Sequence, residues 1–184
     1  GDFLSAICDL KGSVPVVVQR DYVIPAWWDE QWLIIATSHS GNTEEAIEAT
    51  EIALKSGATV IVISTGGILS GLAELHYNCY LIPSIGGQPP RSAFGHIFSR
   101  QLALFRCLGI IPHDSDDQAM LTRLQTVIEE YDFITNQKSD LLELTAYMET
   151  QPIALLGPSE LTPALIRFKN QLNENSARFA RIGV

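Results

Sequence analysis

The 184-residue chain has few cationic side chains and no long apolar run. Its 12 Lys and Arg residues stand against 21 Asp and Glu residues, which gives a formal net charge of −9. So acidic a chain disfavours partners such as nucleic acid or an anionic membrane surface. No apolar stretch approaches the ~20 residues that a membrane-spanning helix needs, and no signal peptide is visible at the start. Any site for an anion must therefore be locally positive within an acidic protein.

Cysteine is scarce and widely spaced. The three residues, Cys8, Cys79 and Cys107, form no Cys-x-x-Cys pair. This spacing disfavours a zinc site and predicts buried free thiols in a reducing compartment, hence a cytoplasmic location. Nothing in the sequence indicates a metal or an organic cofactor.

The most informative stretch runs from Trp32 to Ile47. The apolar run Leu33–Ala36 predicts a buried strand, and an amphipathic helical pattern begins directly after Thr43. The start of a helix offers free backbone N–H groups and a partial positive charge, and hydroxyl groups add further donors. We therefore predict a phosphate or other small-anion site at this turn; its candidate residues are Ser38, Ser40, Gly41, Asn42 and Thr43. The alternative is an ordinary helix cap, where Ser and Thr are common.

Short apolar runs alternate with helical patterns along the first two thirds of the chain. The predicted strands are Val14–Gln19, Leu33–Ala36, Thr59–Ser64 and Cys79–Ile82. This alternation predicts an α/β fold with a parallel sheet covered by helices on both faces. Ligands of such sheets bind beyond the carboxyl ends of the strands, where the candidate anion loop lies.

The remaining chain predicts helices and one more strand. Arg91 follows a Gly- and Pro-rich loop, at the start of a helix over 92–107, where it could contact a substrate or simply lie on the surface. Residues 114–148 read as a polar helix or helix pair with a break at 136–139. A strand over 152–156 and a helix over 161–175 follow, with Leu161, Leu165, Phe168 and Leu172 on one apolar stripe.

Three motifs together resemble a known family. Ser38–Glu45 reads Ser-His-Ser-Gly-Asn-Thr-Glu-Glu and is similar to the phosphate loop of sugar isomerase (SIS) domains, most of all to that of bifunctional phosphoglucose/phosphomannose isomerases. Gln88–Gly95 resembles the family's Gln-Pro-Arg-x-x-x-Gly motif. Arg167–Asn175 resembles its second-domain motif Lys-x-Gln-x-Asn-Glu-Asn.

The resemblance implies an architecture. It predicts an SIS-type doubly wound parallel sheet of flavodoxin-like order, 2-1-3-4-5, followed by the start of a second SIS domain. The implied divisions are a first domain over 1–112 without its first strand and Gly-rich loop, a helical linker over 113–150, and the beginning of a second domain over 151–184. On this basis we expect the chain to be part of a longer polypeptide.

The resemblance also implies a function, the interconversion of glucose 6-phosphate, and of mannose 6-phosphate, with fructose 6-phosphate through an enediolate. Glu174 matches the catalytic base and Arg91 the arginine beside the reacting carbons; a homodimer without a cofactor is implied. The ring-opening histidine of the family would lie beyond Val184, and His39, which could touch ligand, does not match it. Two alternatives remain open: a non-catalytic sugar-phosphate-binding SIS module, and an isomerase domain of the glucosamine-phosphate synthase type. The sequence leaves the choice between glucose and mannose epimers open.

Overall fold

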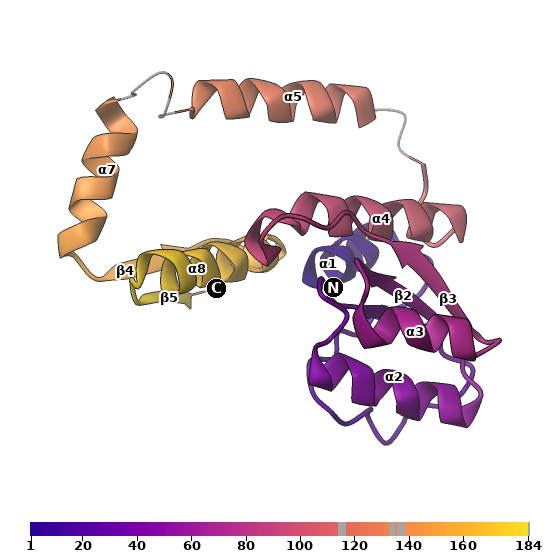
Figure 1. The fold of residues 1–184 in the computed structure, drawn as a ribbon. Helices are drawn as coiled ribbons and strands as arrows, with labels where there is room; N and C mark the ends of the chain where they lie inside the picture. The colour runs from indigo at the N-terminus through magenta and orange to yellow at the C-terminus, as the bar shows by residue number, and fades with distance from the viewer. Residues whose placement is uncertain (114–116, 133–134, 136–138, 184) are drawn as a thin grey trace. The chain divides into compact units, whose positions relative to one another are not determined.

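A computed structural model describes residues 1–113, 117–132, 135 and 139–183. The chain divides into two compact units, one made of Gly1 and Phe3–Ile111 and the other of Pro112–Val184 with Asp2. Figure 1 shows the elements of each unit. The assignment of residues 1–112, 113–150 and 151–184 to SIS domains and a linker stays a prediction.

The first unit is built on a three-stranded parallel sheet. Its strands lie in the order β1-β2-β3, with Ile35 of β1 opposite Ile61 of β2 and Ile61 opposite Tyr80 of β3. The elements of this unit are α1 (Asp2–Lys11), β1 (Ile34–Thr37), α2 (Glu44–Ser56), β2 (Val60–Ser64), α3 (Gly67–Leu75), β3 (Cys79–Pro83), η1 (Pro90–Ser92) and α4 (Phe94–Cys107). Three of the four predicted strands are thereby confirmed to within one residue at each end.

Helices cover both faces of this sheet (Figure 1). On one face, Ala36 and Val62 pack in a core with Ala53 and Leu54 of α2 and Leu69 of α3. The other face has a second core whose buried members are Leu4, Cys8, Phe105 and Ile111, and Ile35 of β1 packs against them. Because successive strand residues point to opposite faces, Ile35 and Ala36 contribute to different cores. The predicted α/β class, with a parallel sheet flanked by helices, is confirmed.

The prediction of a strand at the first of these four segments is wrong. Val14–Gln19 is extended but pairs with no strand in the described part of the chain, and its valines Val14 and Val17 are exposed. The Ser5 hydroxyl of α1 donates a hydrogen bond to the Val16 carbonyl at 3.0 Å. A strand is defined by ladder hydrogen bonds to a neighbour, so apolar content alone does not produce one.

The cysteine prediction holds in part. Cys8 and Cys79 are buried free thiols, but Cys107, at the end of α4, is exposed. Burial raises the pKa of the Cys8 thiol, with a smaller contribution from the nearby Asp9 carboxylate, and burial alone raises the pKa of Cys79. The expectation of three buried thiols is therefore wrong for Cys107.

The second unit contains helices and a small parallel sheet. Its elements are α5 (Asp117–Glu130), α7 (Ser139–Thr150), β4 (Ile153–Leu156), η2 (Ser159–Leu161), α8 (Thr162–Ser176) and β5 (Ala180–Gly183). Strand β5, which the sequence did not reveal, pairs in parallel with β4, with Leu155 opposite Ile182. The predicted break at 136–139 falls mostly on 136–138, which lie outside the described residues.

The helix α8 confirms the predicted helical segment but only part of its apolar stripe. Leu172 is buried, whereas Leu161 and Phe168 are about half exposed at 53% and 49%. In the ranges that the structure describes, no helix is long and apolar enough to cross a membrane.

Candidate functional site

The predicted anion loop, Ser38–Thr43, joins the carboxyl end of β1 to the first turn of α2. Parallel strands place the loops that follow them at one edge of the sheet. The loops after β1, β2 and β3 therefore meet there, and side-chain hydrogen bonds join all three. The candidate site is this edge of the first unit.

Ser38 braces the loop from inside. Its side chain is buried, and its hydroxyl lies 2.7 Å from the hydroxyl of Thr43 and accepts a hydrogen bond from the Gly41 amide at 3.1 Å. Thr43, the N-cap of α2, consequently makes no capping bond to its own helix. Because a helix cannot satisfy its first N–H groups internally, the start of α2 keeps backbone donors that a ligand can take.

Ser40, Asn42 and Thr43 form the exposed rim of the loop. The Ser40 hydroxyl accepts a hydrogen bond from the Asn42 amide at 3.2 Å. Asn42 reaches across to the next loop, where its side-chain oxygen accepts a hydrogen bond from the Ile68 amide at 3.1 Å. Asn42 thus supports the start of α3, and its side-chain nitrogen is the part that remains for a ligand.

Two glycines allow the first and second loops to touch. Gly41 and Gly67 both have a φ of +73°, in the left-handed region that side chains disfavour. A Cβ on Gly41 would collide with the Gly66 carbonyl oxygen, and one on Gly67 with the Ser40 carbonyl oxygen. The motif glycine is therefore required for close contact between the two loops, in addition to any approach to a ligand.

The second loop holds the main chain of the first. The His39 carbonyl accepts hydrogen bonds from both the amide and the hydroxyl of Thr65, at 3.1 and 2.7 Å. The buried Ser64 hydroxyl donates to the Gly66 carbonyl at 2.9 Å and shapes the turn that follows β2. Sequence reasoning missed Ser64 and Thr65, although hydroxyl residues directly after a neighbouring parallel strand were a usable signal.

The third loop, between β3 and α4, carries Arg91. Arg91 is exposed and lies in η1, just before α4. The loop is anchored at its beginning by Arg100, which donates a hydrogen bond from Nε to the Pro83 carbonyl at 2.6 Å. Because Arg91 follows β3, it belongs to the same unit as the anion loop.

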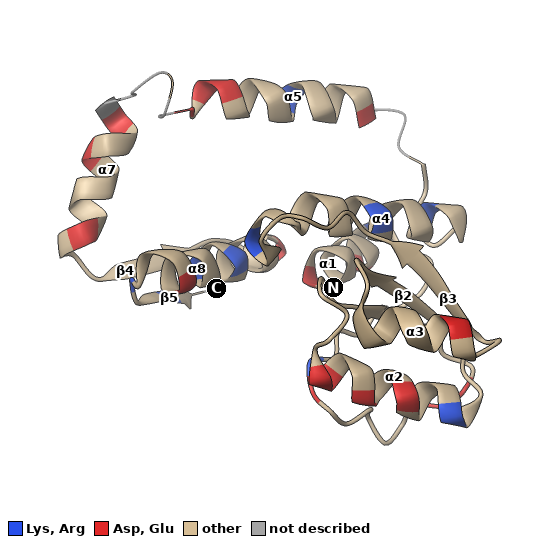
Figure 2. Ribbon diagram, viewed as in Figure 1, with Lys and Arg blue, Asp and Glu red and all other residues tan. Residues whose placement is uncertain are grey.

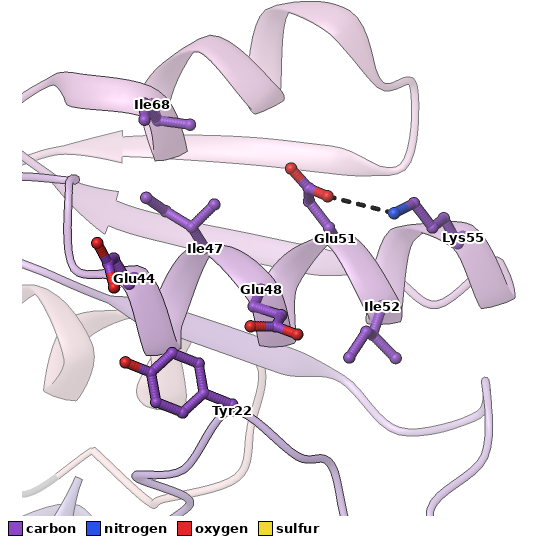
Figure 3. A pocket seen from close by; sticks show the side chains of 8 residues that line it. All are labelled: Tyr22, Glu44, Ile47, Glu48, Glu51, Ile52, Lys55 and Ile68. Atoms are coloured by element: carbon purple, nitrogen blue, oxygen red, sulfur yellow. Dashed lines mark hydrogen bonds and ion pairs between the residues drawn. The ribbon is translucent and has the colours of Figure 1, made fainter.

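The acidic side chains along α2, including Glu44 and Glu45 in its first turn, disfavour an anion beside the helix surface. Figure 2 shows acidic residues along α2, and Figure 3 shows Glu44, Glu48 and Glu51 around a hollow of about 540 Å³ on its outer side. The lysine of this hollow, Lys55, is paired with Glu51 at 3.2 Å. A sugar phosphate therefore has no favourable place in this hollow, and the backbone donors of the loop are the better anion site.

Tyr22 lines the same hollow, beneath the first turns of α2 (Figure 3). The Glu45 carboxylate raises the pKa of the Tyr22 phenol most, with smaller contributions from desolvation and from the carboxylates of Glu44, Glu48 and Asp21. The raised pKa is a consequence of the carboxylates gathered on the outer side of α2.

Glu174 lies in the second unit, in the last turn of α8, and is exposed. Its neighbours shape the end of this helix: the Asn173 side-chain oxygen accepts a hydrogen bond from the Ala180 amide at 3.1 Å, and the Asn175 side chain donates to the Gln171 carbonyl at 3.2 Å. Asn173 thus ties the helix end to β5, Asn175 bonds within the last turn of α8, and Glu174 between them is exposed to solvent. Its predicted role as a base stays a prediction.

Within the described residues, no cluster of three or more His, Cys, Asp or Glu side chains could hold a metal ion. The donors at the candidate site are hydroxyl and amide groups, which suit a phosphate and the hydroxyls of a sugar. The fold is that of an α/β protein, and this loop is its candidate anion site at the carboxyl edge of a parallel sheet.

Comparison with known proteins finds relatives that match most of this chain. The chain is 37% identical over 180 residues to the bifunctional phosphoglucose/phosphomannose isomerase of Caldicellulosiruptor bescii. The matched region covers 96% of this chain and 52% of that protein. It is 32% identical over 168 residues to the enzyme of the same name from Thermoplasma acidophilum, covering 91% of this chain and 50% of that protein. The chain is a homologue of bifunctional phosphoglucose/phosphomannose isomerases, as the motifs predicted.

A further relative is named for a different reaction, an epimerisation. The D-glucosamine-6-phosphate 4-epimerase of Sulfolobus acidocaldarius is 28% identical over 158 residues, or 80% of this chain and 45% of that protein. The chain spans about half the length of the curated relatives it matches. No protein-family profile matches the chain. All the relatives named here act on phosphorylated sugars, so a sugar phosphate is the ligand class that they share.

Proposed function

We propose that the complete protein is an aldose–ketose isomerase that interconverts glucose 6-phosphate, and also mannose 6-phosphate, with fructose 6-phosphate. The phosphate binds at the Ser38–Thr43 loop, and Glu174 and Arg91 act at the first two carbons. The fold proposed behind this activity is an SIS-type doubly wound sheet of flavodoxin-like order, working as a cytoplasmic homodimer. The full-length relatives, of which this chain covers about half, support the substrate class.

The observation that carries the proposal is the construction of the anion loop. Its backbone is held by Ser38, by Thr65 and by the Asn42 contact to α3, while Ser40 and Thr43 stay on the exposed rim. A preformed turn of this kind binds a dianion without paying for its own ordering. The bound phosphate then supplies binding energy that is used at the distant carbons.

The proposed chemistry moves one proton between neighbouring carbons. The Glu174 carboxylate removes a proton from C1 of fructose 6-phosphate, the electrons of the C–H bond form the C1=C2 double bond, and O2 becomes an oxyanion. The guanidinium of Arg91 stabilises this charge, since it stays protonated at every working pH. Glu174 returns the proton to C2 while the O1 proton moves to O2, which leaves an aldehyde at C1. No electrons are gained or lost overall.

The test is turnover by the full-length protein and its Glu174→Gln variant. The wild-type protein should form glucose 6-phosphate from fructose 6-phosphate, followed with a coupled NADP-dependent glucose-6-phosphate dehydrogenase. The amide cannot accept the proton, so kcat should fall by about 10²- to 10⁴-fold, while the affinity for fructose 6-phosphate stays the same. Glu160→Gln, at another exposed carboxylate of the same unit, is the matched control and should keep full turnover.

Two results would redirect the proposal. Tight binding of fructose 6-phosphate by a wild-type protein with no turnover would favour the non-catalytic sugar-phosphate module. Product formation that depends on ammonia would favour the glucosamine-phosphate synthase type, and C4 epimerisation of glucosamine 6-phosphate would place the protein with the epimerase relative.

A further inference from the structure

His39 belongs to the anion loop, but its side chain bonds to a different loop. The Nε2 atom lies 3.0 Å from the backbone carbonyl oxygen of Gln88, in the segment between β3 and α4. A carbonyl oxygen can only accept, so Nε2 carries the hydrogen and donates it. This bond links the loop after β1 directly to the loop after β3.

The main chain of His39 is fixed independently of its side chain. Its carbonyl accepts two hydrogen bonds from Thr65, so the start of the imidazole side chain is held against the loop after β2. A side chain with a fixed origin and one bonded end has little rotational freedom left. His39 therefore acts as a short, stiff connection between its two loops.

The backbone between Gln88 and Arg91 has little conformational freedom. The two residues between them are Pro89 and Pro90, whose rings fix φ. The turn continues into η1, where the Ser92 amide donates to the Pro89 carbonyl at 2.9 Å. A displacement of the Gln88 carbonyl is therefore passed on to Arg91 instead of being absorbed by a flexible chain.

Three polar atoms in the loops after β1 and β3 are left without a hydrogen-bond partner in the described residues. His39 Nδ1, Gln88 Nε2 and Ser84 Oγ are buried and have no hydrogen-bond partner in the described part of the chain. They comprise an acceptor, a donor and a hydroxyl, and each is a type of group that can bond to the hydroxyl groups of a sugar. Buried polar atoms without partners cost free energy, so these groups on the loops after β1 and β3 remain available for a ligand.

We propose that His39 is a positioning residue for the isomerase reaction. It holds the segment that carries Arg91 at a set place relative to the bound phosphate, and it does so through the Gln88 carbonyl. This inference rests on the proposed function, because only that function gives Arg91 a reacting atom to face. It goes beyond the motif, in which His39 has no assigned role.

The experiment compares His39→Phe with His39→Gln in the full-length protein. Phe keeps a flat ring but cannot donate, whereas the Gln amide nitrogen can take the place of Nε2 and donate to the Gln88 carbonyl. His39→Phe should lower kcat by about 10- to 100-fold, the scale of a misplaced catalytic group. Inhibition by inorganic phosphate, which reports on the anion loop alone, should change by less than about twofold. His39→Gln should restore most of the lost kcat.

A second measurement does not depend on activity. Hydrogen exchange of the Ser92 amide should speed up by about 3- to 10-fold in His39→Phe, the rate change that corresponds to losing the hydrogen bond to the Gln88 carbonyl. In His39→Gln the exchange rate should be near that of the wild type. Gln88→Met keeps the accepting carbonyl and is the matched control for exchange at Ser92, which it should leave unchanged.

The outcomes separate this inference from the proposed function. Equal loss of kcat in both His39 variants, or a loss of phosphate affinity as large as the loss of kcat, would overturn the positioning role. A wild-type protein without turnover would overturn the proposed function, and the exchange rates of the two variants would then decide the positioning role alone. Equal exchange in His39→Phe and His39→Gln would reject it in that case too.

Discussion

The side-chain oxygen of Asn42 accepts a hydrogen bond from the backbone amide of Ile68 at 3.1 Å, and so joins the loop after β1 to the start of α3. The contact has the form of a helix cap supplied from another part of the chain. A residue that the motif marks for phosphate binding therefore also stabilises the fold. The two roles can be separated by substitution.

Asn42→Ala removes the accepting oxygen, and Asn42→Asp keeps it while adding a negative charge. Loss of a capping side chain costs about 1 kcal/mol, so Asn42→Ala should lower the free energy of unfolding by about that amount in chemical denaturation. Asn42→Asp should keep the stability but bind inorganic phosphate at least about fivefold more weakly, because like charges at the anion loop repel. Wild-type phosphate affinity in Asn42→Asp would show that the anion binds elsewhere.

Gly41→Ala should be far more destabilising than Gly57→Ala. Both glycines have positive φ, which costs alanine about 1–2 kcal/mol. Around Gly57 there is open space, whereas a Cβ on Gly41 would collide with the Gly66 carbonyl oxygen. The extra clash should roughly double the loss for Gly41→Ala, to about 3 kcal/mol or more, measured as the shift of the denaturation midpoint. Equal losses would mean that the loops after β1 and β2 separate easily.

The phenol of Tyr22 should titrate above its ordinary pKa. The Glu45 carboxylate, the largest cause, disfavours a phenolate nearby, so the phenol keeps its proton to higher pH. Glu45→Gln removes that charge and should lower the pKa of Tyr22 towards the ordinary value. Absorbance near 295 nm, followed against pH, measures this titration, and the difference between each protein and its Tyr22→Phe counterpart isolates the Tyr22 signal. A Tyr22 titration unchanged by Glu45→Gln would show that the two groups are not neighbours.

Local patterns in the sequence predicted most of the elements. A glycine directly after a helical pattern is a stop signal, and Gly57, which follows α2, does adopt the left-handed conformation with φ of +95° that terminates a helix. The strands β1, β2 and β3 were readable because a strand buried on both faces is apolar throughout. The loop between β1 and α2 could be located because Ser38, Ser40, Gly41 and Thr43 lie within six residues; its role as an anion site stays a prediction.

The strand predictions failed where they depended on pairing with a neighbouring strand. Val14–Gln19 has the composition of a strand but no ladder in the described part of the chain, and Ala180–Gly183 lacks a clear strand pattern but pairs with β4. Whether an extended segment becomes a strand depends on a neighbour that local composition does not show. The half-exposed Phe168 is a similar case, since helical spacing gives a face but not what covers it.

The sequence by itself determined the α/β class and the place of the Ser38–Thr43 loop between a buried strand and a helix start. Only the tertiary structure decided what those residues do for one another. Asn42 supports α3, Ser38 bonds to Thr43 and to the Gly41 amide, and His39 reaches Gln88. The reason is physical: a short loop sets which groups are near in the chain, whereas the parallel sheet brings the ends of separate strands to one edge, and hydrogen bonds form between groups that are near in space.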